Sequence, residues 1–398
     1  MVIEAGKNWV EADADTAEAI DFLTFYAGQA LTLANSAPAI QYPGEQNRLE
    51  YIPLGVGVVL PPWNFPLAIL AGMTAAAIVT GNTVVLKPSP LTPTVAHEFV
   101  NLLEHCGIPE GVVELVQGGA DIGASLVEDP RVRFISFTGS KRAGLQIHAT
   151  AASPRSGQKW IKRTILEMGG KDAIVVDRDA DLEIAAEGIV SSAFGFSGQK
   201  CSACSRLIVH RDVYYPLLDA VVDRTRRLPW GDPAENYTVG PVIDLAAYRR
   251  ICEYLDLAVG SGRVLVGGGP YTEPEQGYYI QPTVVADVDP ASRLFQEEIF
   301  GPVLAATPAD GFAQAIEIAN DTEYGLTGAV YSNNEEHLNL AARDFHVGNL
   351  YLNRKCTGAM VGAHPFGGFN MSGTDSKAGG EDYLLLFSQA KSIARKLL

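Results

Sequence analysis

The chain has 398 residues, of which 47% are hydrophobic and 19% are charged. This composition supplies enough apolar surface for a large core and excludes an intrinsically disordered chain. The formal net charge of −16 argues against a partner that is nucleic acid or an anionic membrane surface, and the length favours two or three domains.

The amino end, MVIEAGKNWVEADAD, carries acidic residues where a secretory signal peptide would have its apolar segment, so we expect no signal peptide. The first forty residues predict a helix, because a wide apolar face follows Asp13 and Asp15. GVGVVL (55–60) then predicts a buried strand and PPWNFP a turn. Pro66 is placed to begin a helix that runs through Thr80.

The uncharged stretch 51–86 raises the question of a membrane span. Prolines and glycines interrupt it, and its longest clean piece, 67–80, is too short to cross a bilayer. A buried helix is the better interpretation, and no membrane partner is expected.

Strands alternate with helices along the rest of the chain. The predicted strands are TVVLKP (83–88), VVELV (112–116), VRFISFTGS (132–140), TILEMGG (164–170), DAIVVD (172–177), RLIVH (206–210), TGAVYS (327–332) and GNLYLN (348–353). The predicted helices include 92–107, 181–195, 212–228, 311–320 and 335–345. Strands separated by helices of this length predict parallel sheets with crossover helices, hence an α/β fold. We expect a domain boundary near Gly169 and Gly170.

Three acidic residues, Asp177, Asp179 and Asp181, imitate the start of a calcium loop. The glycine that such a loop requires is missing, because position 182 is leucine, and no glutamate closes the loop. We interpret these residues as a turn and the cap of the next helix.

The stretch FSGQKCSAC (196–204) holds two of the five cysteines. The other three, Cys106, Cys252 and Cys356, are scattered, which does not resemble a disulfide framework and predicts a reducing, cytoplasmic location. Cys201 and Cys204 could be half of a zinc site, a redox pair, or a nucleophile with a neighbour. No second Cys-x-x-Cys and no closely spaced pair of histidines accompanies these cysteines, so we expect no metal site. A thioredoxin-like redox pair should follow an early strand, whereas this pair lies in the middle of the chain, so that interpretation is also weak.

Three further fragments each have an ordinary and a functional interpretation. Asn64 in PWNFP is either a turn asparagine or a rigid amide donor to an oxyanion. Glu167 in LEMGGK is either a solvated carboxylate at a strand end or a general base in an apolar cleft. FTGSKRAG (137–144) is a weak phosphate-binding signal by itself.

Together these fragments resemble the aldehyde dehydrogenase superfamily. GQKCSACSR and LEMGGK look like its two signature motifs, and PWNFP, VVLKPS, FTGS, EEIFGP and PFGG occur in the family's order. The resemblance implies two parallel-sheet domains, a Rossmann-like cofactor domain and a catalytic domain, plus a small oligomerisation sheet. Chains of the family begin well before the equivalent of Met1, so the cofactor domain is expected to lack its first elements. The expected segments are 1–41 and 54–168 for NAD binding, 169–373 for catalysis, and 42–53 and 383–398 for oligomerisation.

The resemblance also implies roles for single residues. Cys201 would be the nucleophile, Glu167 the general base and Asn64 an oxyanion donor. Cofactor contacts would come from Lys87, Ser89, Gly139, Ser140, Glu298 and Phe300. NAD is the expected cofactor. NADP is a weaker alternative, because Ser89 and Pro90 stand where many members carry a glutamate that repels a 2′-phosphate.

EADADTAEAIDF (11–22), YPGEQNRLEYIPLG (42–55) and RKCTGAMVGAHPFGG (354–368) are similar to the branch that oxidises L-glutamate γ-semialdehyde. In that branch the substrate would contact Glu18, Phe65, Ile69, Ser202, Gly358, Ala359 and Phe366. The alternatives are another semialdehyde dehydrogenase, or an impaired form that only folds or binds nucleotide. A small-molecule substrate and a homodimer or higher homo-oligomer are expected.

Overall fold

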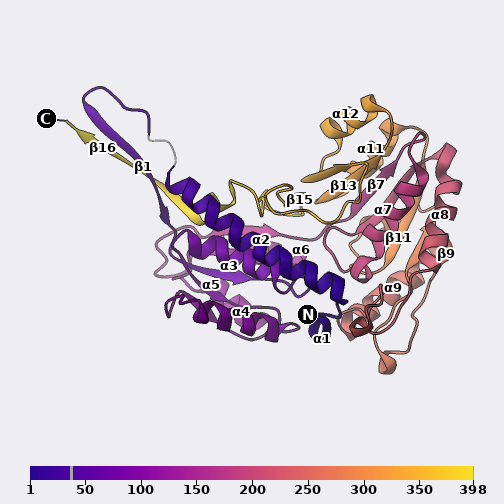
Figure 1. Ribbon diagram of the computed structural model, residues 1–398, viewed down its shortest axis with the longest axis horizontal. Helices are drawn as coiled ribbons and strands as arrows, with labels where there is room; N and C mark the ends of the chain where they lie inside the picture. Colours follow the sequence, from indigo (N-terminus) through magenta and orange to yellow (C-terminus); the bar gives the residue numbers. More distant parts are fainter. Residues whose placement is uncertain (36–38, 398) are drawn as a thin grey trace. The chain divides into compact units, whose positions relative to one another are not determined.

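The computed structural model describes residues 1–35 and 39–397 (Figure 1). Residues 36–38 of the predicted segment 1–41, and residue 398 of the predicted segment 383–398, lie outside the described residues. The chain forms two compact units. The five-stranded unit contains residues 14–167, 359–366 and 376–398, and the seven-stranded unit contains residues 1–13, 168–358 and 367–375.

The five-stranded unit is built on a fully parallel sheet of order β4-β3-β2-β5-β6. Its strands are β2 (Val56–Leu60), β3 (Thr83–Leu86), β4 (Val113–Leu115), β5 (Phe134–Thr138) and β6 (Arg163–Glu167). Its helices are α2 (Trp9–Ala34, which begins in the other unit), α3 (Ala68–Val79), α4 (Pro93–His105), α5 (Ala120–Glu128) and α6 (Lys141–Ala151). The strand order reverses direction between β2 and β5, a point at which α/β sheets commonly bind ligands.

Helix α2 begins at Trp9, within the first forty residues for which the sequence predicts a helix. Asn8 explains this, because its side-chain oxygen accepts from the amide of Glu11 and caps the helix. The buried carboxylate of Asp15 instead accepts from the amide of Ala68, 2.7 Å away, and so caps α3.

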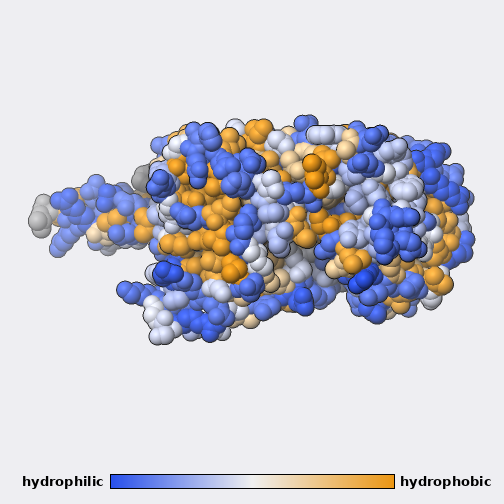
Figure 2. Space-filling view, turned by 90° about the horizontal axis from the view of Figure 1, so that it is seen from below, coloured by the Kyte–Doolittle hydropathy of each residue, from blue (hydrophilic) through white to orange (hydrophobic). Residues whose placement is uncertain are grey.

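An antiparallel ribbon joins two segments of the five-stranded unit that lie far apart in the sequence. Strand β1 (Glu45–Pro53) pairs along its whole length with β16 (Ser388–Lys396). The ribbon projects away from the helices of its own unit (Figure 1), and its surface is mostly hydrophilic with a few apolar residues (Figure 2). Just before β16, the short helix η5 (Tyr383–Phe387) buries Tyr383 and Phe387 in the core of this unit, so part of the predicted oligomerisation segment 383–398 is core.

The seven-stranded unit has a sheet of order β14-β13-β7-β8-β11-β10-β9. Its strands are β7 (Asp172–Val176), β8 (Cys204–His210), β9 (Arg263–Val266), β10 (Thr283–Ala286), β11 (Val303–Ala309), β13 (Thr327–Tyr331) and β14 (Asn349–Leu352). All neighbours are parallel except β9, which runs antiparallel to β10. A two-stranded piece pairs β12 (Tyr324–Gly325) with β15 (Phe369–Asn370).

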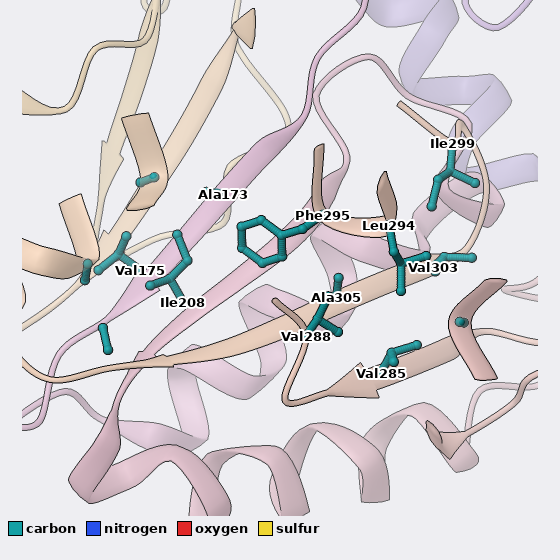
Figure 3. Packing of buried hydrophobic residues seen from close by; sticks show 14 of the residues in the cluster. Ala173, Val175, Ile208, Val285, Val288, Leu294, Phe295, Ile299, Val303 and Ala305 are labelled. Atoms are coloured by element: carbon teal, nitrogen blue, oxygen red, sulfur yellow. The ribbon is translucent and has the colours of Figure 1, made fainter. Parts of the chain in front are cut away.

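The helices of the seven-stranded unit are α1 (Val2–Ala5), α7 (Leu182–Phe194), α8 (Tyr214–Arg226), α9 (Leu245–Ser261), α10 (Arg293–Gln296), α11 (Phe312–Asn320) and α12 (Glu335–Asp344), with short 3₁₀ turns η1 (Gly195–Gly198), η2 (Arg211–Val213), η3 (Pro233–Glu235) and η4 (Pro274–Gln276). One core cluster lies between the sheet and α9 to α11 (Figure 3). In it, Val175 and Ile208 from neighbouring strands pack with Phe295 of α10.

The predicted α/β fold with parallel sheets is confirmed. The first residues differ from the prediction, which assigned 1–41 to the cofactor domain, because Met1–Asp13 belong to the seven-stranded unit. Glu11 forms an ion pair with Lys200 at 2.8 Å, and the ammonium of Lys7 lies 5.0 Å from the ring centre of Phe196. In the described part of the chain no helix is both long and apolar enough to cross a bilayer.

Candidate active site

A left-handed turn carries Cys201. Helix α7 ends at Phe194, and Phe196 and Ser197 then adopt positive φ values of 51° and 53°. Gly198 follows with a φ of 69°, and a Cβ on it would lie 2.4 Å from the carbonyl oxygen of Gly301. This turn therefore needs a glycine at position 198, which explains the glycine in the motif FSGQKC.

Buried polar contacts fix this turn. The hydroxyl of Ser197 donates to the carbonyl of Gly240 at 2.8 Å. The side chain of Gln199 is buried, and its oxygen accepts from the amide of Ile243 at 2.8 Å. The residues just before Cys201 are thus tied to the loop around residues 240–243, which holds the cysteine in one orientation.

The two cysteines of the motif differ in access. Cys201 is a free, partly exposed thiol, whereas Cys204 is 1% exposed at the start of β8. Burial raises the pKa of Cys204 well above its ordinary value, and a hydrogen bond with Cys356 adds to the effect. Cys204 therefore stays a thiol at neutral pH, while a nucleophile must be an accessible thiolate. The geometry favours Cys201 for chemistry and an inert, packed Cys204.

Buried hydrogen bonds also surround Ser202, the residue after Cys201. The carbonyl of Ser202 accepts from the hydroxyl of Thr327 and from the thiol of Cys356, each at 3.4 Å. The amide of Thr327 in turn donates to the carboxylate of Asp172 at 2.7 Å. Ser202 is itself buried. Neither Thr327 nor Asp172 was predicted as a site residue, because in the sequence each is simply the first residue of a strand and belongs to no motif.

Glu298 reaches the motif LEMGGK from the segment that follows α10. One oxygen of its carboxylate accepts from the amide of Gly170 at 3.2 Å. A Cβ on Gly169 would lie 2.2 Å from the same carboxylate, so the carboxylate of Glu298 would have to move if position 169 carried a side chain. Phe300, two residues later, has a positive φ of 57°. Gly169 of the motif thus leaves room for the carboxylate of Glu298.

Lys171 is buried beside these residues, and its Nζ makes no hydrogen bond within the described part of the chain. Burial lowers the pKa of Lys171 to about 7; the positive charge of Arg206 lowers it too, while Glu298 and Asp172 oppose the shift. Lys171 was not predicted as a site residue, although the lysine ends the quoted motif.

Gly358 is exposed with a φ of 76°, and its carbonyl accepts from the guanidinium of Arg354 at 3.0 Å. Gly358 is the last residue of its segment in the seven-stranded unit, and Ala359 begins a segment of the five-stranded unit. Phe366 ends that short segment, where its amide and carbonyl pair with those of Ala378.

In the five-stranded unit, Asn64 lies in the turn between β2 and α3 and is buried. Phe65 and Ile69, in the same turn and on α3, are partly buried, as is Glu18 on α2. The start of α3 is held by its cap from Asp15. A turn fixed in this way can present the Asn64 amide in one orientation, as an oxyanion donor requires.

Glu167 is the last residue of β6 and is buried. Its carbonyl accepts from the amide of Gly139 at 3.0 Å, and its carboxylate accepts a hydrogen bond from the hydroxyl of Ser376. The structure thus brings Glu167 beside Gly139 and Ser376 within one unit. Ser376 was not predicted, because a serine in a glycine-rich loop carries no signal of its own.

Four of the residues expected to hold a dinucleotide, namely Lys87, Ser89, Gly139 and Ser140, lie just beyond the carboxyl ends of the parallel strands β3 and β5. The other two, Glu298 and Phe300, belong to the seven-stranded unit. Buried Lys87 follows β3, and its ammonium donates to the carbonyl of Pro88 at 2.8 Å. The hydroxyl of Ser89 accepts from the amide of Leu91. Ser140 follows β5 and caps α6, whose amino terminus is suited to a pyrophosphate. These groups fit a nicotinamide dinucleotide, since an amino group, a helix terminus and the glycine at 139 meet at one edge of the sheet.

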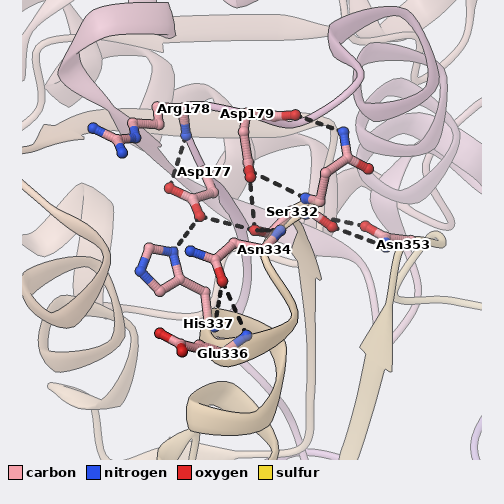
Figure 4. Close-up of polar contacts among 9 residues, drawn as sticks. Asp177, Arg178, Asp179, Ser332, Asn334, Glu336, His337 and Asn353 are labelled. Carbon is pink, nitrogen blue, oxygen red and sulfur yellow. Dashed lines mark hydrogen bonds and ion pairs between the residues drawn. The ribbon is translucent and has the colours of Figure 1, made fainter.

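A second polar cluster lies at the carboxyl ends of β7, β13 and β14 (Figure 4). Asp177 accepts from Ser332 and contacts His337, and Asp179 accepts from Ser332 and Asn333. Burial alone would raise the pKa of Asp177, but hydrogen bonds from His337 and Ser332 outweigh it, so the pKa is lowered.

Asp181 caps α7 as predicted. Among the described residues no three His, Cys, Asp or Glu side chains gather in a way that could hold a metal ion.

Residues 1–393 match the model of the aldehyde dehydrogenase family. A curated relative from Anoxybacillus flavithermus, named 1-pyrroline-5-carboxylate dehydrogenase, is 60% identical over 99% of this chain and 76% of its own length. A relative of the same name from Bacillus mycoides is 57% identical over 100% of this chain and 77% of its own length.

Solved structures agree. The 1-pyrroline-5-carboxylate dehydrogenase from Thermus with bound NAD is 50% identical, with a TM-score of 0.97 over 99% of this chain and 77% of that chain. Proline utilization A from Bdellovibrio bacteriovorus is 44% identical, with a TM-score of 0.96 over 99% of this chain and 41% of that chain. The chain belongs to the aldehyde dehydrogenase family.

Proposed function

We propose that this chain oxidises L-glutamate γ-semialdehyde, the open form of Δ1-pyrroline-5-carboxylate, to L-glutamate with NAD in proline degradation. The observation that carries the proposal is the 60% identity, over 99% of the chain, to relatives named 1-pyrroline-5-carboxylate dehydrogenase. The chain also keeps Cys201, Glu167 and Asn64, the three residue types that the chemistry needs.

The first half of the reaction begins at Cys201. Its thiolate adds to the aldehyde carbon, which becomes a tetrahedral thiohemiacetal with a negative oxygen. The side-chain amide of Asn64 and the backbone amide of Cys201 would donate to that oxygen. The fixed turns around both residues support this role, because donors that are already oriented need no reorganisation during the reaction.

NAD, when bound, accepts the hydride that leaves the former aldehyde carbon. Lys87 and Ser89 would hold its adenosine ribose, and Gly139 and Ser140 would lie beside its pyrophosphate. Glu298 would bind the nicotinamide ribose, with Phe300 packed nearby. A carboxylate fixed by the amide of Gly170 is a suitable acceptor for ribose hydroxyls.

The second half of the reaction releases glutamate. Loss of hydride leaves a thioester on Cys201, and Glu167 would take a proton from water so that hydroxide attacks the thioester carbonyl. The carbon–sulfur bond then breaks, the thiolate of Cys201 returns, and glutamate leaves with the new oxygen.

The substrate carries a carboxylate and an amino group besides the aldehyde. Ser202 and the backbone amides of Gly358 and Ala359 would bind the carboxylate. Glu18 would meet the amino group, and the side chains that would line the aliphatic chain are Phe65, Ile69 and Phe366.

A steady-state assay tests this function. Purified protein is given Δ1-pyrroline-5-carboxylate or succinate semialdehyde, each with NAD and with NADP, and reduced cofactor is measured. We expect the highest kcat/KM with Δ1-pyrroline-5-carboxylate and NAD, and glutamate as the product. Faster turnover of succinate semialdehyde would assign the chain to another semialdehyde. A preference for NADP would overturn the cofactor assignment.

A further inference from the structure

We propose that Ser376 is a positioning residue for Glu167: its hydroxyl holds one carboxylate oxygen of the base and favours the ionised form that can accept a proton. This inference rests on the proposed function only in the role that it gives to Glu167. It adds a residue that lies outside the motifs by which the chain was recognised.

The contact joins two buried residues that lie 209 positions apart in the sequence. Ser376 is 2% exposed and Glu167 is 8% exposed. The Oγ of Ser376 donates to Oε1 of Glu167. Both residues belong to the five-stranded unit, so the contact is internal to that unit.

The backbone on each side of this hydrogen bond is fixed. Glu167 pairs with Thr138 in the parallel ladder between β6 and β5, and its carbonyl accepts from Gly139. Beyond Ser376, Ala378 forms two backbone hydrogen bonds with Phe366, each 2.8 Å long. A hydroxyl on such a support can select one orientation of the carboxylate at little cost in side-chain entropy.

The amide of Gly379 also donates to the phenolic oxygen of Tyr26, 2.8 Å away. Tyr26 is fully buried in the core of this unit. The loop that carries Ser376 is therefore anchored to the segment 359–366 through Phe366 and to helix α2 through Tyr26. Its position is set by the core rather than by solvent-exposed contacts.

The chemistry of the contact follows from burial. Burying a carboxylate favours its protonated form, which cannot act as a base, whereas a hydroxyl that donates to the carboxylate favours the ionised form. One titratable group that senses the charge of Glu167 is Tyr383 on η5. Burial raises the pKa of Tyr383, and the charge of Glu167 adds to that shift, so Tyr383 stays neutral. Without Ser376, the pKa of Glu167 should rise.

The test compares the wild type with Ser376→Ala and Ser376→Thr. The steady-state kcat is measured as a function of pH for each protein. The amplitude of the NADH burst in the first turnover is measured as well. In Ser376→Ala the acid limb of kcat should move to higher pH by about one unit, as expected for the loss of one hydrogen bond to a charged group. Ser376→Thr keeps a hydroxyl and should restore the limb. The burst amplitude at alkaline pH should not change, because hydride transfer precedes the step that uses Glu167.

Ser388→Ala is the matched control. Ser388 is a buried serine of the same unit whose hydroxyl donates to the carbonyl of Leu384, and its loss should not move the acid limb. A Ser376→Ala variant with a slower rate but an unchanged acid limb would show a purely structural role and overturn the proposal. So would a Ser376→Thr variant that shifts the limb as far as Ser376→Ala does.

A second readout does not depend on turnover. Infrared difference spectra between each protein and its Glu167→Gln counterpart isolate the carboxyl band of Glu167 during a pH titration. The proposal expects this band to titrate at higher pH in Ser376→Ala than in the wild type, and equal titration would overturn it. If the wild type oxidised no aldehyde, the proposed function would fail while this titration still decided the role of Ser376.

Discussion

The α-carbon of Gly170 faces the carbonyl oxygen of Cys201 so closely that a Cβ on it would lie 2.7 Å from that oxygen. The second glycine of LEMGGK is thus needed by the cysteine motif, although the two motifs are separated in the sequence. A Cβ on Gly169 would likewise lie 2.2 Å from a carboxylate oxygen of Glu298. We therefore expect different kinetic effects when each of these glycines is replaced by alanine.

Gly170→Ala should lower kcat by on the order of 10²-fold, because the added methyl group displaces the backbone of Cys201 from its position. Gly169→Ala should instead raise the KM for NAD by roughly tenfold with a smaller effect on kcat, since the flexible carboxylate of Glu298 can move away. Gly260→Ala is the control, because nothing lies within 4 Å of a Cβ there. Equal kinetics for Gly170→Ala and Gly260→Ala would contradict the account of the turn.

Glu167→Gln should separate the two halves of the reaction. Glutamine cannot take a proton from water, so thioester hydrolysis should slow far more than hydride transfer. Stopped-flow measurement should show a burst of NADH close to one equivalent, followed by slow turnover. A uniformly slow first turnover without a burst would assign Glu167 to the first half instead.

Lys171→Met should raise stability in a pH-dependent way. The folded-state pKa of Lys171 is lowered to about 7 from an ordinary value of 10.5. Between these values the unfolded chain binds the proton and the folded chain does not, so the contribution of Lys171 to the free energy of unfolding rises with pH. The penalty for burying the ammonium is fully present below about pH 7 and is absent above pH 10.5.

The measurement is the difference in Tm between Lys171→Met and the wild type at several pH values. We expect the variant to be more stable by the largest margin near pH 7, and the margin should shrink toward pH 10. The exposed Lys159→Met variant should show no such trend. A margin that stays constant with pH would mean that Lys171 carries no buried charge.

We expect the chain to self-associate through the ribbon of β1 and β16. Isolated two-stranded ribbons are marginally stable in water, and this one exposes the apolar side chains of Leu49 and Tyr51. Light scattering should report a dimer or higher oligomer at micromolar concentration. Tyr51→Arg should weaken that association, because it places a charge on the ribbon, and a wild-type protein that is purely monomeric would rule the idea out.

The alternating strands and helices could be predicted where each strand is short, apolar and bounded by turns, as at β2 and β7. These strands are buried on both faces of a parallel sheet and so read as continuous apolar runs. Strand β11 is not among the predicted strands, and its Pro308 is a residue that argues against a central strand. The proline is tolerated because β10 pairs only with the first residues of β11, up to Ala305, so no strand in the described part of the chain pairs with β11 on that side at Pro308.

The candidate site could be predicted only in part. Cys201, Glu167 and Asn64 lie in short motifs with unusual composition. Ser376 and Thr327 are common residues in common settings, and their roles depend on contacts with residues far away in the sequence. No local pattern records such a contact.

The measurement that tests the central claim most directly is NADH formation from Δ1-pyrroline-5-carboxylate by the wild type, Cys201→Ala and Cys204→Ala, with glutamate identified by mass spectrometry. The two cysteines are matched, because they lie in the same motif and differ in exposure. The account predicts glutamate and NADH in equal amounts from the wild type, most of that rate from Cys204→Ala, and none from Cys201→Ala. Activity in Cys201→Ala, or equal loss in both variants, would contradict it.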